Sequence, residues 1–321
     1  MELSVIICTH NPRRDYLERT LNALKAQTLP KEQWELLLID NASKEPLAGQ
    51  WDLSWHPHAR HIREDELGLT PARLRGIKEA QSELLLFVDD DNLLARDYLS
   101  HALELAQAWP ALGAWSGKMT PEYEEVPAAE LTPLLNCLAL NSHVLTRDQW
   151  SNAPTLQNHA LPCGAGMCVR REVARSYAQL VQGNSLRRAL DRKGGSLLSS
   201  GDTDMALVGC DLGFGTGIFT RLGLTHLISK KRVQPEYLFR LHEAIGVSLK
   251  ILAAIRGQPV SRPCLSERLF QKYKYWRAKG ADKVSLAAEA RIHQRSLELW
   301  QSINQPTNSA DTIKLWTSGS G

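Results

Sequence analysis

Residues 84–92 read Leu-Leu-Leu-Phe-Val-Asp89-Asp90-Asp91-Asn92. The apolar run predicts a buried strand of a parallel sheet, and ligands of such sheets bind beyond the carboxyl ends of the strands. Adjacent carboxylates repel one another by about 1 kcal/mol or more per pair, so we expect a cation among them. A divalent metal with oxygen ligands, Mn²⁺ or Mg²⁺, is the natural choice and would also neutralise a diphosphate. The structural alternative is that an Asp caps a following helix, although one Asp suffices for a cap.

Two further strands end in polar residues. Residues 3–8 form a short β-branched run that ends in Thr9-His10-Asn11-Pro12, and residues 34–39 (Trp-Glu-Leu-Leu-Leu-Ile) lead directly into Asp40. Asp and Asn also start turns, so Asp40 alone is a weak signal. Because the carboxyl ends of parallel strands lie at one edge of a sheet, we expect these residues to meet Asp89 there.

Helical and strand patterns alternate over the first 115 residues. Helices are expected over 13–27, 70–80 and 97–108, and a short third strand over 61–63. Strands separated by helices predict an α/β fold with a mostly parallel sheet flanked by helices. Beyond this half we expect strands over 111–119 and 165–169, a helix over 172–180, a functional segment within 120–160, and mainly helices after Thr203.

Composition supports a globular protein with reduced thiols. The 321 residues carry a net charge of +3, with 43% hydrophobic and 23% charged residues. Six scattered cysteines contain no CxxC pair, which favours a cytoplasmic protein over a disulfide or zinc framework. The N-terminal apolar run is too short for a signal peptide, and no stretch approaches about 18 uninterrupted apolar residues, the length of a membrane span.

Six motifs in order resemble family 2 glycosyltransferases of the GT-A fold. The similarity covers roughly residues 3–245. The motifs are Ser-Val-Ile-Ile-Cys-Thr-His-Asn-Pro (4–12), Leu-Leu-Leu-Ile-Asp-Asn-Ala-Ser (36–43), the helix start at 68–76, Phe-Val-Asp-Asp-Asp-Asn (87–92), Pro-Cys-Gly-Ala-Gly-Met-Cys-Val-Arg-Arg (162–171) and Ser-Gly-Asp-Thr-Asp-Met (200–205).

The resemblance implies an inverting transfer of a sugar from a nucleotide-diphospho-sugar to an acceptor hydroxyl, with Mn²⁺ or Mg²⁺ as cofactor. Asp202 would be the catalytic base and would accept the proton of the attacking hydroxyl. The metal would be held by Asp91 and His226. The nucleotide-sugar, most simply a UDP-sugar, would be bound by Thr9, Asn11, Asp40, Arg73, Asp89 and Asp90.

Some positions depart from the family pattern or allow a structural role. Leu74 follows Arg73 where the family often has Asn, and Gly201-Asp202 replaces a Glu-Asp pair, which leaves Asp204 as a second candidate base. Asp202 could also cap a helix. His226 could be a purely structural histidine, and Gly164-Ala-Gly166 either a sugar-binding loop or a tight turn. Three aromatic residues could stack on an acceptor sugar or only pack in the interior. They are Trp115, Tyr123 and Trp150.

We expect a glycosyltransferase domain over 1–245, divided into a nucleotide-sugar half (1–115) and an acceptor half (116–245). A helical extension over 246–304 and a loose tail over 305–321 would follow. Between Lys230 and Arg295 we count 15 Lys and Arg against 5 Asp and Glu. With the aromatic segment 269–276, this basic region, including Lys230, Lys231, Arg232 and Arg277, could bind anionic lipid headgroups on the cytoplasmic face of the inner membrane, or be a solvated helical face.

Other functions fit less well. A metal-dependent nucleotidyltransferase would use similar carboxylates, but the loop after the first strand lacks glycine. A non-catalytic nucleotide-sugar-binding protein would bind without turnover. A dinucleotide oxidoreductase lacks its GxGxxG after the first strand, a P-loop is absent, and no zinc finger or helix-turn-helix indicates nucleic-acid binding. The acceptor is expected to be a sugar or a lipid-linked sugar.

Overall fold

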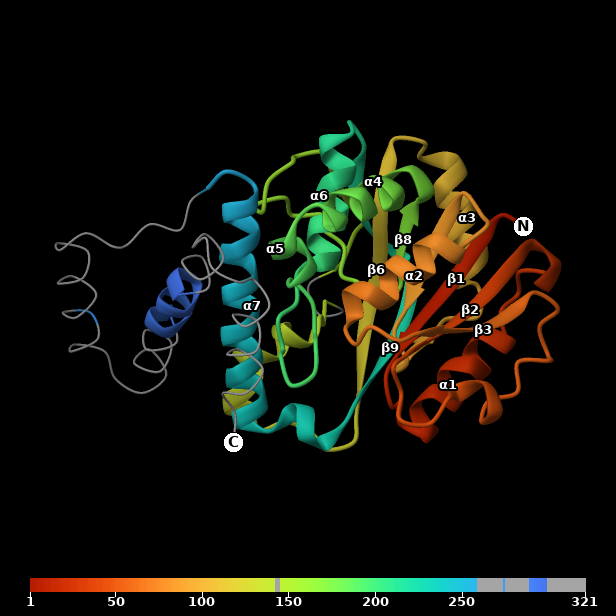
Figure 1. The fold of residues 1–321 in the computed structure, drawn as a ribbon, viewed down its shortest axis with the longest axis horizontal. Helices are drawn as coiled ribbons and strands as arrows, with labels where there is room; N and C mark the ends of the chain where they lie inside the picture. The colour runs from red at the N-terminus through yellow and green to blue at the C-terminus, as the bar shows by residue number, and fades with distance from the viewer. Residues whose placement is uncertain (142–144, 259–273, 275–288, 299–321) are drawn as a thin grey trace.

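A computed structural model describes residues 1–141, 145–258, 274 and 289–298. Its described part contains one nine-stranded sheet, in the order β3-β2-β1-β4-β8-β6-β9-β5, with β7 paired to β9 (Figure 1). The first four strands of this order pair in parallel, as the sequence predicts, and their apolar side chains are almost wholly buried. They are β1 (Leu3–Thr9), β2 (Trp34–Asn41), β3 (Ala59–Glu64) and β4 (Leu84–Val88).

The second half of the sheet mixes strand directions. β8 (Met167–Arg170) is antiparallel to both β4 and β6 (Leu112–Tyr123), whereas β6 and β9 (Gly215–Ile228) are parallel. β5 (Asn92–Leu94) and β7 (Gln149–Ser151) pair antiparallel with β9. The sheet is therefore mostly parallel in strand direction, which confirms the predicted α/β class.

Most of the described residues after Thr203 are helical, as expected, but the sequence did not predict the strand β9. β9 is the longest of the described strands, at 14 residues, and it pairs with β6 along most of its length. Gly215, Gly217 and Gly223 lower its local strand propensity, because glycine is depleted in strands. Pairing with β5, β6 and β7 overrides that weak local preference.

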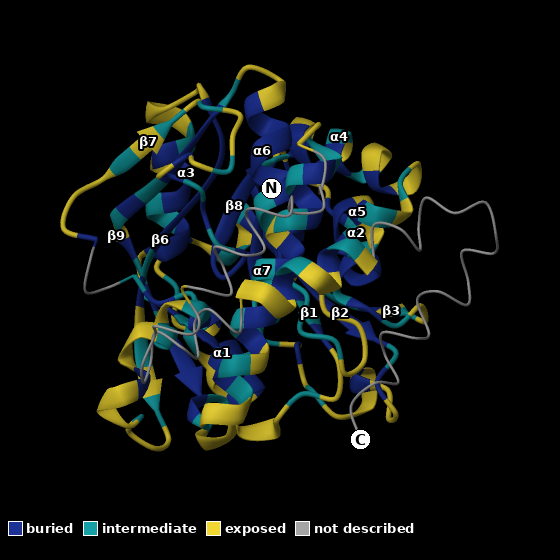
Figure 2. Cartoon of the chain, turned by 90° about the vertical axis from the view of Figure 1, so that its left-hand side faces the viewer, coloured by how far each residue is buried: buried dark blue, intermediate teal, exposed yellow. Residues whose placement is uncertain are grey.

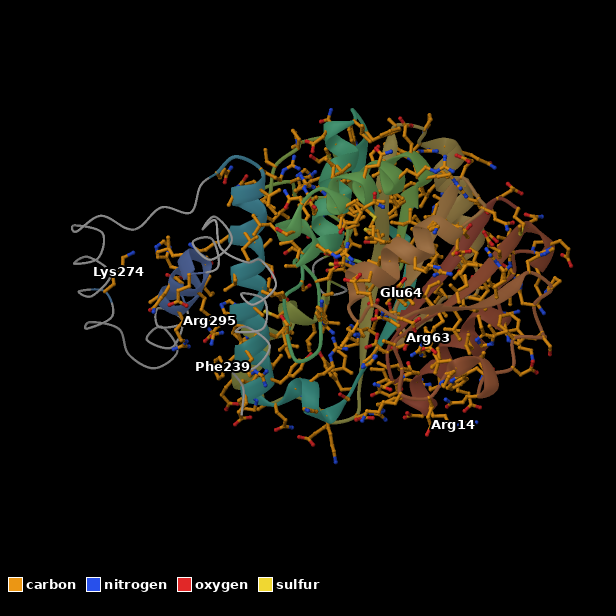
Figure 3. All side chains as sticks on the ribbon, in the orientation of Figure 1. Arg14, Arg63, Glu64, Phe239, Lys274 and Arg295 are labelled. Atoms are coloured by element: carbon orange, nitrogen blue, oxygen red, sulfur yellow. The ribbon has the colours of Figure 1, made fainter. Side chains whose placement is uncertain are left out.

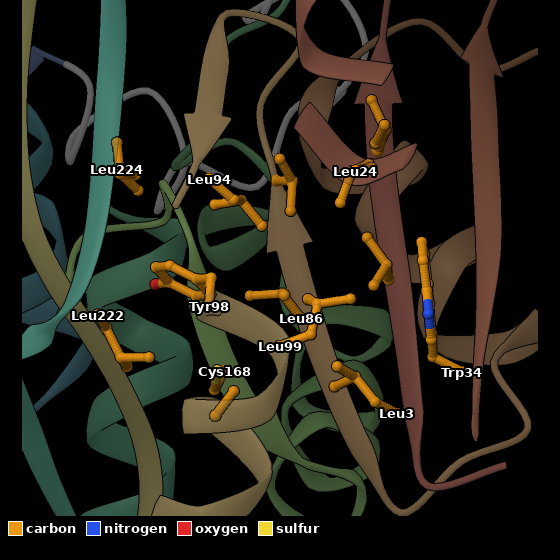
Figure 4. Close-up of a cluster of buried hydrophobic side chains, with 14 of the residues drawn as sticks. Leu3, Leu24, Trp34, Leu86, Leu94, Tyr98, Leu99, Cys168, Leu222 and Leu224 are labelled. Atoms are coloured by element: carbon orange, nitrogen blue, oxygen red, sulfur yellow. The ribbon is translucent and has the colours of Figure 1, made fainter. Parts of the chain in front are cut away.

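Helices cover both faces of the sheet. On one face lie α1 (Arg14–Lys25) and α3 (Tyr98–Ala108), whose leucines and Tyr98 pack on β1 and β4 (Figure 4). On the other face lie α2 (Leu69–Glu79), α4 (Arg171–Gln182) and α6 (Gly201–Asp211). Figure 2 shows the dark blue buried residues gathered in the sheet and on the inner sides of these helices. The helices predicted over 13–27, 70–80, 97–108 and 172–180 are all present.

A third group of elements closes the carboxyl edge of the sheet. α7 (Pro235–Ile255) packs against the 3₁₀ segments η3 (Ala129–Leu138) and η4 (Lys230–Val233), and against α5 (Ser185–Arg188). Two shorter 3₁₀ turns lie nearer the N-terminus, η1 (Lys31–Gln33) and η2 (Leu47–Gly49). The segment expected to be functional, 120–160, thus contributes η3 to this edge. The expected boundary between residues 245 and 246 falls inside α7.

A separate helical segment, residues 289–298, lies beside α7. Arg291 and Arg295 form ion pairs with Glu243 of α7, at 2.6 and 3.6 Å (Figure 3 labels Arg295), and Ile292 packs against Gly246. The aromatic segment 269–276, apart from Lys274, lies outside the described residues, as do Arg277 and the expected tail 305–321. Among the described residues, none of the helices combines the length and apolar character that a membrane span requires.

Candidate functional site

A cavity of about 550 Å³ lies at the carboxyl ends of β1, β2 and β4. The beginning of α2, the loop before β8, the segment 191–203, η3 and α7 complete its wall. Predicted site residues line it together: Thr9, Arg73, Asp89, Asp90, Asp91, Asp202 and His226. The structure therefore brings seven of the nine predicted residues into one cavity.

The acidic turn leads from β4 into β5, so the interpretation of these aspartates as a helix cap is wrong. Asn92 shapes the turn from within. Its Oδ1 accepts the backbone N–H of Asp89 at 3.2 Å, and its Nδ2 donates to Oδ1 of Asp91 at 3.0 Å. The carboxylates of Asp89 and Asp91 are only partly exposed and line the cavity.

The carboxylate of Asp90 is partly buried and lies beside two other carboxylates, those of Asp89 and Asp91. Its Oδ2 accepts a hydrogen bond from the Thr9 hydroxyl at the end of β1, and Thr20 of α1 donates to its backbone carbonyl at 3.1 Å. Burial, reinforced by the charge of Asp91, raises the pKa of Asp90 to about 7. Burial and Asp91 also raise the pKa of Asp89. The negative charges of Asp89 and Asp90 are therefore incompletely compensated, as the sequence indicates.

Asp91 has two basic neighbours that come from β9 and from η4. The β5–β9 pairing places Asn92 opposite His226, and Nε2 of His226 lies 3.4 Å from Oδ2 of Asp91. Nη1 of Arg232 donates to the same Oδ2 at 2.7 Å and lies 3.1 Å from Nε2 of His226. Although burial opposes it, His226 and Arg232 hold the pKa of Asp91 well below its usual range.

Arg232 thus does not belong to a lipid-binding surface, and that part of the basic-region interpretation is wrong. Its side chain is 16% exposed and faces the acidic turn, whereas Lys230 and Lys231 are exposed. Linear sequence groups the three cations, but η4 directs them to different sides. Among the described residues, the guanidinium of Arg232 pairs with Asp91.

The donor set at Asp91 is suited to a divalent cation. Nδ1 of His226 lies 3.1 Å from the Leu138 carbonyl, which only an N–H can satisfy, so a neutral ring would leave Nε2 as the nitrogen that can bind a metal ion. The separation of 3.4 Å between Nε2 and Oδ2 can be bridged by one ion at ligand distances of about 2.0–2.2 Å. The described residues contain no group of three or more His, Cys, Asp and Glu side chains arranged for a metal. Water and substrate phosphates would have to supply the other ligands, as is usual for Mg²⁺.

Arg73 is the second cation of the cavity. It lies on α2, is 5% exposed, and its Nη1 donates to Oδ2 of Asp191 at 3.0 Å. Although burial opposes it, the carboxylates of Asp191, Asp202 and Asp89 raise the pKa of Arg73. Asp191 also accepts hydrogen bonds from Thr70 and from the backbone of Gly201, so it ties α2 to the start of α6. Arg73 is therefore a fixed positive charge between Asp202 and the acidic turn.

Asp202 and Asp204 lie in different surroundings. Oδ2 of Asp202 accepts the backbone N–H of Gly164 at 2.6 Å, and its Oδ1 accepts that of Thr203 at 2.8 Å. Asp204 is fully buried and forms a two-oxygen ion pair with Arg187, at 2.6 and 2.7 Å. Burial raises the pKa of Asp204 to about 6. Only the first of the two carboxylates lines the cavity.

Asn11 and Asp40 do not line the cavity. Asn11 is exposed, adopts a positive φ of 47°, and its Oδ1 accepts the backbone N–H of Lys44. Asp40 is buried, where its two oxygens accept the backbone N–H groups of Ser43 and Leu47. Arg63, labelled in Figure 3, donates to Asp40 at 2.8 Å. Here both residues shape the loop after β2.

The three aromatic residues that could stack on an acceptor sugar lie in different parts of the structure. Trp115 is fully buried, and Tyr123 packs with the apolar cluster under α7. Trp150 is 54% exposed beside Trp109, and it does not line the cavity. In contrast, Asp191, Arg192 and Arg232 do line it, although the sequence did not single out the first two. Asp191 and Arg192 lie in an irregular segment, which carries no periodic signal that could have identified them.

Comparison with known proteins gives one family for the first half of the chain. The sequence model described as Glycosyl transferase family 2 matches residues 4–175. Glycosyltransferase AglE of Haloferax volcanii is 32% identical over 92 residues, which are 28% of this chain and 30% of that protein. Poly(ribitol-phosphate) beta-N-acetylglucosaminyltransferase TarS of Staphylococcus aureus is 27% identical over 105 residues, 32% of this chain and 18% of that protein. The chain thus spans less than a third of the length of these two relatives.

A solved structure also aligns with most of the chain, at low similarity. The crystal structure of S. aureus TarS 1–349 in complex with UDP-GlcNAc is 17% identical and superposes with a TM-score of 0.48. The alignment covers 96% of this chain and 93% of that one.

Proposed function

The chain belongs to glycosyl transferase family 2, and on that premise we propose that it transfers a sugar, with inversion, from a nucleotide-diphospho-sugar to an acceptor hydroxyl. One observation carries the proposal. Asp202 and the acidic turn 89–91 line the same cavity, and Arg73 is close enough to both for their charges to raise its pKa. When the acceptor hydroxyl attacks the sugar directly, no covalent intermediate with the enzyme forms. The reaction then needs a base for the hydroxyl and a binding site for the departing diphosphate in the same cavity.

Asp202 is the proposed base. An acceptor hydroxyl is a poor nucleophile at neutral pH until a positioned carboxylate accepts its proton. The backbone N–H groups of Gly164 and Thr203 orient Asp202, and its carboxylate remains at the cavity wall. Asp204 is unsuited to this step because both of its oxygens bind Arg187 away from the cavity.

The acidic turn and its surrounding cations form the proposed donor end. Asp89 and Asp90 would face the ribose and sugar, and Thr9 orients Asp90 through its hydroxyl. Asp91 and His226 would hold Mn²⁺ or Mg²⁺, and a bound ion would supply positive charge to the departing diphosphate. Arg73 presents a fixed guanidinium to the same region.

We assign a UDP-sugar as donor and a sugar or lipid-linked sugar as acceptor, in the synthesis of a cell-surface polysaccharide or glycolipid. The names of two relatives agree with this class of pathway. TarS is a poly(ribitol-phosphate) beta-N-acetylglucosaminyltransferase, and TuaG of Bacillus subtilis, 28% identical over 106 residues, is a putative teichuronic acid biosynthesis glycosyltransferase.

A donor screen with a base variant tests the proposal. UDP-, GDP- and dTDP-sugars would be incubated with Mn²⁺ and a panel of saccharides, and thermal shift and released nucleotide would be recorded. We expect Asp202→Asn to keep donor affinity but to lose transfer by about 100-fold or more, the scale of a general base. Asp97→Asn, at the exposed start of α3, is the matched control. Unchanged turnover in Asp202→Asn would reject the assigned base, and no response to any nucleotide-sugar would reject the proposed reaction.

A further inference from the structure

The guanidinium of Arg232 takes the position that a metal ion would need. Oδ2 of Asp91 and Nε2 of His226 are the two candidate metal donors, and Nη1 of Arg232 contacts both, at 2.7 and 3.1 Å. A lone pair that accepts an N–H bond cannot at the same time coordinate an ion. Metal binding at this pair and the observed position of Arg232 therefore exclude each other.

Arg232 is also incompletely satisfied where it is. Its Nε is buried and has no hydrogen-bond partner among the residues that the structure describes, which is costly for a charged donor. The side chain lines the cavity beside the acidic turn. An anionic oxygen delivered to the cavity would satisfy this donor, and a diphosphate carries several. In its present position Arg232 thus compensates the charge of Asp91, but its own Nε–H has no partner among the described residues.

The charges at the acidic turn also favour the exchange of the Arg232 guanidinium for a metal ion. The guanidinium forms one ion pair with Asp91, whereas three carboxylates, those of Asp89, Asp90 and Asp91, line the cavity at this turn. A divalent ion would replace one positive charge with two at the same carboxylate. The exchange would also free the guanidinium for the diphosphate that accompanies the ion.

We propose that Arg232 is a resident counter-cation that competes with the divalent metal for Asp91 and His226. The metal binds weakly to the protein alone, and it binds well only when an anionic ligand draws Arg232 away. This inference rests on the proposed donor site, but it concerns metal affinity and not turnover.

Mn²⁺ binding to the full chain tests the competition. Free Mn²⁺ would be measured by electron paramagnetic resonance during titration, first without nucleotide and then with UDP. We expect Arg232→Gln to bind Mn²⁺ alone at least 10-fold more tightly than the wild type, and Arg232→Lys to be intermediate because its charge stays. Lys231→Gln removes the same charge from the adjacent, exposed position and should leave the affinity unchanged.

The double variants Arg232→Gln/Asp91→Asn and Arg232→Gln/His226→Gln should lose the tighter Mn²⁺ binding of Arg232→Gln. That loss would locate the ion at Asp91 and His226. UDP should tighten Mn²⁺ binding by the wild type far more than by Arg232→Gln. Equal or weaker Mn²⁺ binding by a folded Arg232→Gln variant would overturn the proposal, as would the absence of binding by both proteins. A chain that shows the competition but transfers no sugar would fail the proposed function and leave this inference standing.

Discussion

The backbone N–H of Gly164 donates to Oδ2 of Asp202 at 2.6 Å, across 38 residues of chain. A Cβ atom at position 164 would lie 2.5 Å from Nη2 of Arg73 and 3.1 Å from Oδ2 of Asp202. Glycine is therefore required here for close approach. The loop before β8 and the first turn of α6 are held together at the candidate base, with Arg73 filling the remaining space.

Replacing this glycine should damage the chemistry more than the fold. In Gly164→Ala the new methyl group must displace Arg73 or Asp202, and a small misplacement at a reacting group is expensive. We expect kcat to fall at least 10-fold while Tm changes by only a few degrees. Gly49→Ala, whose Cβ meets nothing within 4 Å, is the matched control. Full activity of Gly164→Ala would show that this contact does not position the base.

The two neighbouring aspartates should separate stability from catalysis. Asp204→Asn leaves Arg187 buried without its counter-charge, and breaking a buried ion pair by removing one partner costs about 3–5 kcal/mol. Asp202→Asn should lower the free energy of unfolding much less. Urea denaturation of both variants measures the difference. A more stable Asp204→Asn than Asp202→Asn would contradict the roles assigned to the pair.

Asp91 should control metal dependence. Asp91→Asn removes the charge that His226 and Arg232 share, so we expect Mn²⁺-stimulated transfer to be abolished in a protein that still folds. Circular dichroism verifies the fold, and released nucleotide measured with Mn²⁺ and with a chelator gives the metal response. Undiminished Mn²⁺-dependent activity in this variant would exclude Asp91 as a ligand.

Asp90 should make stability depend on pH. Its pKa is about 7 in the folded protein against about 4 in an unfolded chain, so the folded state binds the proton more tightly. The free energy of unfolding then falls as the pH rises from about 4 to about 7. Asp90→Asn cannot ionise, and we expect it to melt several degrees above the wild type at pH 8 but close to it at pH 4.

Thermal melts of Asp90→Asn and of the exposed control Asp97→Asn at both pH values measure this effect. A difference between Asp90→Asn and the wild type that is the same at pH 4 and pH 8 would argue against a raised pKa at Asp90.

Strong local patterns predicted the fold of roughly the first 115 residues. The runs at 3–8, 34–39 and 84–88 are too apolar to be exposed, so each had to be a buried strand, and the polar residues that follow them had to share one edge. β9 could not be recognised in this way, because its glycines weaken the local signal and its partner β6 lies about 100 residues away. With β9 missing, nothing in the sequence could place Arg232 against Asp91.

By itself, the sequence determined that carboxylates gather at the end of a buried strand and that they require a compensating cation, because both follow from burial and charge along one short segment. Only the tertiary structure decided which basic side chains lie beside Asp91, which of Asp202 and Asp204 lines the cavity, and that Asp40 and Asn11 are turned into the protein's own loops. These outcomes depend on contacts between distant segments, where pairing and packing outweigh any preference that a local sequence can express.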